Sequence, residues 1–330
     1  MPRPKPQLVL APLLLAGIAV QCAPPPATAE SEVDLDGAAV DAAPEPIELA
    51  LEDGVGRLVT LLPETPRERP LRGALLVPSA SFAAGPAWNS GARSPSFAEA
   101  LLDQGRAVFL LDFPGYGACE DPVEPATFGA ERAAEYVVAA IERIRVDHGI
   151  ERIDLLGWSW GAQVAGVTAM RGPEGLGRVV LYGFNPSLRY PADILPNGPL
   201  RPLERSSVDS DFVDGHYDAA IRDAFAEAVL AADTSTPSGA IRDFVEHLPL
   251  VDPEAIDVPV LVLSGQFEVE LPPGGPEEWR PFFAERAEDL EAFARAGGFE
   301  SIVVPGGGHA AHMDDASDAW RTAVLEFLGS

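Results

Sequence analysis

Short apolar runs alternate with helix-like segments along most of this chain, and this alternation limits the choice of fold more than any other feature. Runs rich in Val, Leu, Ile and Phe that end at turn residues are typical of buried strands, and they occupy 73–79, 107–113, 153–159, 178–184, 258–265 and 301–308. Amphipathic segments lie between them, such as 131–149, whose apolar residues recur at helical spacing. Strands that alternate with helices predict an α/β fold with a mostly parallel sheet and helices on both faces.

One long interruption divides the alternation. Residues 185–257 contain no good strand signal, are rich in Pro, Asp and Ser, and hold two helix-like segments near 216–232 and 239–248. The sequence therefore predicts a core built from 47–184 and 258–330, with 185–257 inserted as a helical cap. Because ligands of such sheets bind at the carboxyl ends of the strands, the residues that follow each strand are the informative ones.

The charge of the chain excludes one class of partner. With 51 acidic and 23 basic residues the formal net charge is -28 at pH 7, so we expect neither nucleic acid nor anionic membrane surfaces to bind. A hydrophobic fraction of 47% is that of a globular protein rather than a disordered chain.

The first residues are predicted to be an export signal. An apolar run over 8–20 follows a basic start and is too short to span a bilayer comfortably. Cleavage before Cys22 would give a lipoprotein tethered to the membrane, and cleavage after Ala29 a soluble product. We expect 1–29 to be a signal peptide or lipoprotein signal and 30–46 an acidic linker. The mature protein is then periplasmic or membrane-anchored, with secretion as the alternative.

The stretch "DLLGWSWGAQ" places Ser159 where a strand ends and a helix begins, between Gly157 and Gly161. In that context G-x-S-x-G indicates a nucleophile elbow, a turn so tight that it needs the two glycines. Together with "DFPGYG" at 112–117, the stretch resembles the α/β-hydrolase superfamily over roughly residues 47–328. The resemblance implies an α/β-hydrolase sheet and Ser159 as a catalytic nucleophile.

A serine hydroxyl needs a base, and the resemblance places a histidine after the last strand. His309 stands there, in "VVPGGGHAAH". The resemblance also places an acid after the preceding strand, where Glu268 lies three residues beyond Gly265. Glu270 is the alternative acid, because side chains two apart on an extended stretch share a face and periodicity cannot choose between them.

The oxyanion site needs two backbone N–H donors. The resemblance implies that Trp160, the residue after the nucleophile, supplies one of them. The second is expected from the loop after 73–79, where Pro78 has no N–H to donate. Ala80 is the expected donor by position, with Ser79 and Ser81 as alternatives.

Two other groups of side chains are given structural roles. His312 with Asp314 and Asp315 matches no metal-binding spacing, so no metal site is predicted, and the two aspartates are expected to favour the start of the last helix. Only Cys22 and Cys119 are present, so no disulfide framework is implied, and Cys119 is expected to be a buried free thiol.

These features favour an exported serine hydrolase of carboxylesterase or lipase type. Ser159, His309 and Glu268 would cleave a carboxylic ester of a small-molecule acyl substrate through an acyl-enzyme, without a cofactor or metal. A peptidase, a thioesterase or an acyltransferase on the same triad remains an alternative. So does a non-catalytic binding protein that kept the fold. The sequence leaves the oligomeric state open.

Overall fold

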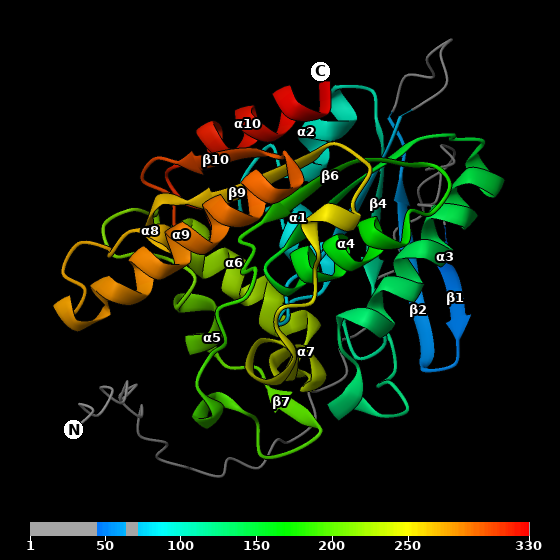
Figure 1. The fold of residues 1–330 in the computed structure, drawn as a ribbon. Coiled ribbons are helices and arrows are strands. Elements are labelled where there is room, and N and C mark those ends of the chain that lie inside the picture. Colours follow the sequence, from blue (N-terminus) through cyan, green and yellow to red (C-terminus); the bar gives the residue numbers. More distant parts are fainter. Residues whose placement is uncertain (1–44, 64–71, 330) are drawn as a thin grey trace, which may run out of the picture. The chain divides into compact units, whose positions relative to one another are not determined.

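A mixed sheet of eight strands forms the centre of the computed structural model, which describes residues 45–63 and 72–329 (Figure 1). The strand order is β1-β2-β4-β3-β5-β6-β9-β10. β1 pairs antiparallel with β2, β2 pairs antiparallel with β4, and all other neighbours are parallel. The strands are β1 (Ile47–Leu51), β2 (Gly54–Leu61), β3 (Gly73–Val77), β4 (Ala107–Asp112), β5 (Ile153–Trp158), β6 (Leu176–Tyr182), β9 (Val260–Gly265) and β10 (Glu300–Val304).

The apolar runs of the sequence form the parallel strands, and their burial explains why those runs do not alternate. Every residue of β3, β5 and β9 is buried, because helices cover the sheet on both faces. From Gly56 onward, β2 alternates between buried and half-buried residues instead. The predicted α/β architecture with a mostly parallel sheet is therefore confirmed.

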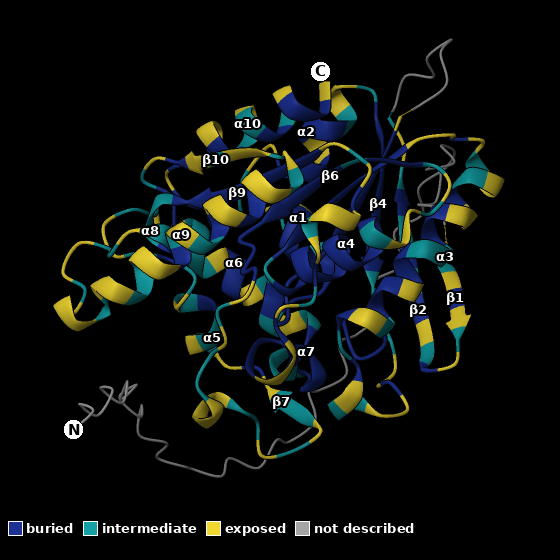
Figure 2. Ribbon diagram, in the orientation of Figure 1, coloured by how far each residue is buried: buried dark blue, intermediate teal, exposed yellow. Residues whose placement is uncertain are grey.

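Two hydrophobic cores lie on opposite faces of the sheet (Figure 2). One contains the apolar residues of α3 (Ala130–His148), α4 (Trp160–Arg171) and α9 (Arg280–Gly297). The other contains those of α1 (Ala84–Asn89), α2 (Phe97–Asp103) and α10 (Ser317–Gly329). Local signals set the helix ends: Ser96 forms a capping box at the start of α2, and Gly149 ends α3 with φ 64°.

The insertion between β6 and β9 is mostly helical and irregular. Its elements are η2 (Ala192–Ile194), β7 (Leu200–Pro202), α5 (Arg205–Asp209), α6 (Ala219–Ala232), β8 (Ser235–Pro237), α7 (Gly239–Arg242), the π-helix η3 (Asp243–His247) and η4 (Pro253–Ala255). The antiparallel pair β7–β8 was not predicted, because each strand is three residues long and contains a proline. The helix expected over 239–248 has one α-helical turn and continues as a π-helix.

The cap packs against the core through aromatic and polar contacts. Phe225 of α6 lies 5.4 Å from Phe82 and 6.5 Å from Trp158, measured between ring centroids. Asp233, just after α6, accepts hydrogen bonds from the backbone N–H groups of Ala83 and Gly117. These contacts bring α6 next to the loop that follows β3.

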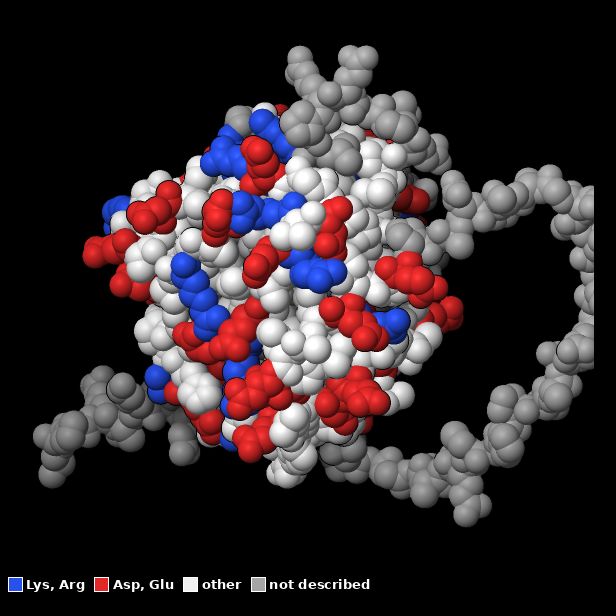
Figure 3. Space-filling view, turned by 90° about the vertical axis from the view of Figure 1, so that its right-hand side faces the viewer, with Lys and Arg blue, Asp and Glu red and all other residues white. Residues whose placement is uncertain are grey.

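The remaining short helices are η1 (Pro125–Thr127), α8 (Gln266–Val269) and η5 (Glu277–Trp279). Acidic side chains are spread over the face shown in Figure 3, with basic ones between them. Among the described residues, no helix combines the length and apolar character needed to cross a membrane. The predicted signal over 1–29, Cys22 and nearly all of the linker lie outside the described residues.

Candidate active site

Ser159 sits in a sharp turn between β5 and α4. Its backbone angles are φ 59° and ψ -116°, and it is the one non-glycine residue with positive φ in the part of the chain that the structure describes. Such a conformation costs about 1–3 kcal/mol and persists where the surroundings enforce it. A Cβ on Gly157 would collide with the carbonyl oxygen of Gly161, and one on Gly161 with that of Pro78. The two glycines flanking the serine are therefore required by close backbone approach.

His309 and Glu268 come together from the ends of two neighbouring strands. His309 lies in the loop after β10, and Glu268 lies in α8, directly after β9. His309 Nδ1 is 2.7 Å from Glu268 Oε1, while the backbone N–H of Gly265 donates to Oε2 at 2.9 Å. The Glu268 side chain is 4% exposed and that of His309 26%, so the carboxylate is shielded from water while the imidazole remains partly accessible.

Backbone contacts place this pair beside Ser159. The N–H of Ser159 donates to the carbonyl of Tyr182 at 2.7 Å, and the next residue, Gly183, leaves space for His309. A Cβ on Gly183 would lie 2.9 Å from His309 Cε1. The indole N–H of Trp158 donates to the carbonyl of His309 at 2.9 Å. The ends of β5 and β6 and the loop after β10 therefore meet at one point.

The charge states within the pair follow from its surroundings. Burial by itself raises the pKa of Glu268, but His309, Arg286 and the N–H of Gly265 together hold that pKa below its ordinary value. Burial by itself lowers the pKa of His309. The charge and hydrogen bond of Glu268, helped by Asp211, outweigh it and raise that pKa. An ionised Glu268 accepts a hydrogen bond from the Nδ1–H group of His309, which leaves Nε2 without a proton and able to act as a base.

The predicted oxyanion donors lie at the start of α4 and in the loop after β3. Among the described residues, neither the N–H of Trp160 nor that of Ala80 has a hydrogen-bond partner. The N–H of Ser81 donates to Ser79 Oγ at 3.3 Å, and Tyr116 fixes the loop by donating to the carbonyl of Ala80 at 3.2 Å. The N–H groups of Trp160 and Ala80 are therefore available for the predicted role, whereas that of Ser81 is already paired with Ser79.

Comparison with known proteins identifies the fold. The family model described as alpha/beta hydrolase fold matches residues 83–212. The chain has the α/β-hydrolase fold. A 2-hydroxymuconate semialdehyde hydrolase of Pseudomonas putida is 25% identical over 186 residues, which is 51% of this chain and 63% of that relative. The match therefore spans less than two thirds of the relative's length.

Solved structures with the same fold cover most of the chain. An esterase of Thermogutta terrifontis superimposes with a TM-score of 0.58 at 19% identity, over 86% of this chain and 98% of that one. An enol-lactonase of Burkholderia xenovorans LB400 gives a TM-score of 0.58 at 18% identity, over 86% and 100%. At these identities the likeness concerns the fold.

Within this α/β-hydrolase fold, the two candidate acids occupy different environments. Glu270 is exposed, and its carboxylate accepts a hydrogen bond from Gln266 Nε2 at 2.8 Å. The assumption that Glu268 and Glu270 share a face is wrong, because 266–269 form a helical turn rather than an extended stretch. The structure pairs His309 with Glu268 and leaves Glu270 on the surface.

The other singled-out side chains have structural surroundings. His312 is buried with Nε2 3.2 Å from the carbonyl of Ala87, and burial lowers its pKa to about 3. Asp314 accepts from the N–H groups of Gly308 and Ala316 just before α10. No group of ligands fit to hold a metal ion occurs among the described residues.

Cys119 is half-buried rather than fully buried, and it is a free thiol. Burial, reinforced by Asp112, raises its pKa to about 12, so the thiol stays protonated at neutral pH. A protonated thiol is a poor nucleophile, which agrees with the structural role expected for this residue.

Two residues near the pair were not predicted. Arg286 of α9 is 6% exposed, and its NH2 group lies 3.1 Å from Glu268 Oε1. It occupies the buried stripe of α9 together with Leu290 and Phe293, and a cation on that stripe is the signal that could have revealed it. Asp211 of the cap interacts electrostatically with His309. Burial, partly offset by nearby cations, raises its pKa to about 6.

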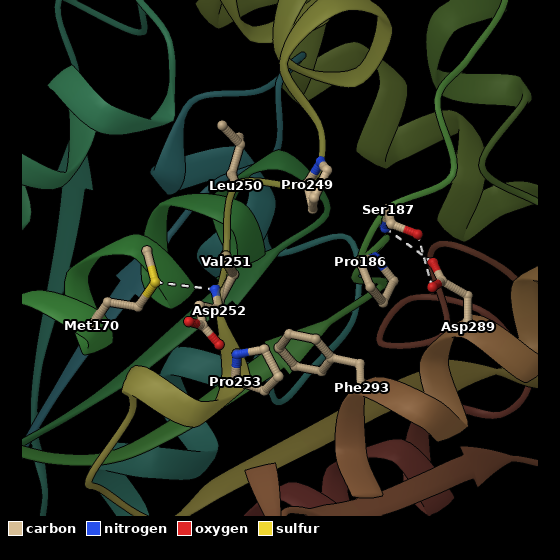
Figure 4. A pocket seen from close by; sticks show the side chains of 10 residues that line it. All are labelled: Met170, Pro186, Ser187, Pro249, Leu250, Val251, Asp252, Pro253, Asp289 and Phe293. Atoms are coloured by element: carbon tan, nitrogen blue, oxygen red, sulfur yellow. Dashed lines mark hydrogen bonds between the residues drawn. The ribbon is translucent and has the colours of Figure 1, made fainter. Parts of the chain in front are cut away.

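The cavity in Figure 4 is separate from this site. It has a volume of about 570 Å³ and lies between Met170 of α4, Phe293 of α9 and the segment 249–253. Ser187 on its wall is hydrogen-bonded to Asp289 through both its N–H and its hydroxyl. None of the predicted catalytic residues lines it.

Proposed function

We propose that the protein is an exported serine hydrolase that cleaves a carboxylic ester through an acyl-enzyme. The observation that carries the proposal is the pair of Glu268 and His309, 2.7 Å apart, beside a serine held at φ 59° between a strand and a helix. These groups meet at the carboxyl ends of the parallel strands. In acyl transfer, a buried carboxylate acts as the acid, an imidazole as the base and a strained serine as the nucleophile.

Each residue has one task in the proposed reaction. Ser159 Oγ attacks the carbonyl carbon while His309 Nε2 takes the hydroxyl proton. The negative charge on the carbonyl oxygen is received by the N–H groups of Trp160 and Ala80. Collapse of this intermediate expels the alcohol, which leaves with the proton from His309, and Ser159 keeps the acyl group.

Water completes the cycle. His309 takes a proton from a water molecule as its oxygen attacks the acyl carbon, and the same two N–H groups receive the charge again. His309 then returns the proton to Ser159, and the carboxylic acid leaves. Glu268 stays ionised throughout and stabilises the imidazolium that forms twice in each turnover.

The names of two proteins with the same fold are in line with an ester substrate. An esterase and an enol-lactonase share the fold over 86% of the chain, and both names refer to ester bonds, open or cyclic. The alternative activities would use the same triad. A peptidase or a thioesterase would expel an amine or a thiol instead of an alcohol, and an acyltransferase would pass the acyl group to an acceptor other than water. Export through the N-terminal segment remains part of the proposal.

A substrate panel tests the proposal. p-Nitrophenyl esters of increasing acyl length, matched thioesters, lactones and aminoacyl anilides are offered to the wild type and to Ser159→Ala. We expect the wild type to turn over esters or lactones fastest and Ser159→Ala to lose this activity. Preferential cleavage of anilides would indicate a peptidase. No turnover of any compound would favour a binding protein with this fold.

A further inference from the structure

We propose that Arg286 is a positioning residue that acts through Glu268 to set the pH range in which His309 serves as the base. The inference rests on the proposed hydrolase function and adds to it a fourth residue that does not touch the substrate. It concerns a buried cation on α9, an element outside both the nucleophile elbow and the cap.

Arg286 and His309 share one oxygen atom. Glu268 Oε1 lies 2.7 Å from His309 Nδ1 and 3.1 Å from the NH2 group of Arg286. The side chains of Arg286 and Glu268 are 7% and 4% exposed, so water screens their interaction little. The carboxylate of Glu268 therefore contacts the guanidinium of Arg286 and the imidazole of His309 at the same time.

Other contacts of Arg286 fix its position without neutralising it. Its NH1 group lies 3.3 Å from the hydroxyl of Tyr190, and its NH2 group lies 3.5 Å from the carbonyl of Phe184. Its Nε has no hydrogen-bond partner among the described residues. Glu268 is the carboxylate within ion-pair distance, and burying a guanidinium without such a partner would be unfavourable.

Charged and titratable groups from several elements surround Arg286, Glu268 and His309. Asp211 of the cap attracts a proton to His309, whereas Arg286 opposes its uptake. Further groups that interact with Glu268, His309 or Arg286 are Tyr182, Tyr190, Asp289 and His312, and Arg201 interacts with Asp211. Among these, Arg286 is the cation in direct contact with the carboxylate that holds His309.

The direction of the effect follows from the charge of the pair. The neutral imidazole with ionised Glu268 carries one negative charge, and the protonated pair carries none. A fixed cation beside the pair stabilises the unprotonated form, so it lowers the pH at which the pair releases its proton. This holds for the apparent pKa of the pair whichever atom carries the proton. Without Arg286, His309 would stay protonated to higher pH and could act as a base only above that pH.

The test is the dependence of kcat/KM on pH, measured between pH 4.5 and 9 with one ester substrate. Arg286→Met removes the charge but keeps an unbranched, flexible side chain that can fill part of the buried space, and Arg286→Lys keeps the charge. Arg295→Met is the matched control, because Arg295 lies on the same helix and is 70% exposed in a pair with Glu291. Far-UV circular dichroism confirms that each variant is folded.

We expect the acidic midpoint of the profile to rise by roughly one pH unit in Arg286→Met, as when one neighbouring charge is lost. The midpoint of Arg286→Lys should stay near that of the wild type, and that of Arg295→Met should not move. A uniform loss of kcat/KM at every pH, with an unchanged midpoint in Arg286→Met, would overturn the proposal and leave Arg286 a structural residue. So would failure of both Arg286→Met and Arg286→Gln to fold.

The test separates this inference from the proposed function. If the wild type hydrolyses no ester or lactone and a phosphonate does not label Ser159, the proposed function fails before any variant is compared. If the wild type is active and its acidic midpoint is insensitive to Arg286, only the inference about Arg286 fails.

Discussion

Replacing Glu268 with glutamine keeps the size of the side chain but removes an acceptor that the site requires. One carboxylate oxygen accepts the N–H of Gly265 at 2.9 Å, and the other accepts from His309 and from Arg286. A glutamine amide has a single acceptor oxygen. If its NH2 group faced Gly265, two donors would oppose each other. If it faced His309, the ring would have to carry its proton on Nε2, where it could not act as a base.

The expected losses can be estimated from these contacts. A wrong imidazole tautomer in a triad costs up to about 10⁴-fold in turnover, or roughly 5 kcal/mol of transition-state stabilisation. Glu268→Gln also removes the counter-ion of buried Arg286, which should lower the free energy of unfolding by roughly 3–5 kcal/mol. The variant is therefore predicted to be less stable and almost inactive.

Two measurements distinguish these losses. Urea unfolding gives the stability of the variant, and kcat and KM with a p-nitrophenyl ester at pH 8 give its activity under conditions where it is folded. Glu270→Gln is the matched control, because the exposed Glu270 bonds only to Gln266 and should behave like the wild type. Activity of Glu268→Gln within tenfold of the wild type would refute the reasoning, and Asp211 would become the next carboxylate to replace.

Further predictions concern the cap, a buried histidine and the N-terminus. Phe225→Ala should change the ratio of kcat/KM between short and long acyl esters, because Phe225 packs on Phe82 beside the predicted oxyanion loop; an unchanged ratio would contradict this. His312, with its pKa lowered to about 3, stays neutral in the folded state while the unfolded chain takes up a proton below about pH 6.5, so stability should fall as the pH drops from 6.5 towards 3. Between pH 7 and pH 4.5, urea unfolding should therefore show a loss about 2 kcal/mol larger in the wild type than in His312→Gln, and equal losses would contradict the burial argument. The intact mass of protein from its native host should correspond to a chain that begins at Cys22 with a diacylglyceryl group or near Glu30, and a chain that retains Met1 would exclude export by cleavage.

The sheet could be predicted because the apolar residues of each strand show how deeply that strand is buried. Strands such as β5 and β9 are buried on both faces, so a continuous apolar run identifies them without knowledge of their neighbours. β7 and β8 could not be found in this way. Each has three residues with a proline, and they form a pair only because the cap brings them together.

In the candidate site, too, the features set by neighbouring residues could be predicted and those set by packing could not. The turn at Ser159 is local, and the glycines that allow it lie within two residues, so the sequence alone indicates it. The choice between Glu268 and Glu270 depended on whether the chain after β9 turns, which periodicity over a few residues does not determine. Arg286 reaches Glu268 from a different helix, and only packing brings the two together.

The central claim is that Ser159 is a nucleophile activated by His309, and covalent labelling tests it most directly. A fluorophosphonate is incubated with the wild type, Ser159→Ala and His309→Ala at pH 8, and the products are analysed by intact mass and peptide mapping. We predict one phosphonyl group per wild-type chain, attached to Ser159, with no labelling of Ser159→Ala and much slower labelling of His309→Ala. An unlabelled wild type, or a label on another residue that persists in Ser159→Ala, would contradict the account.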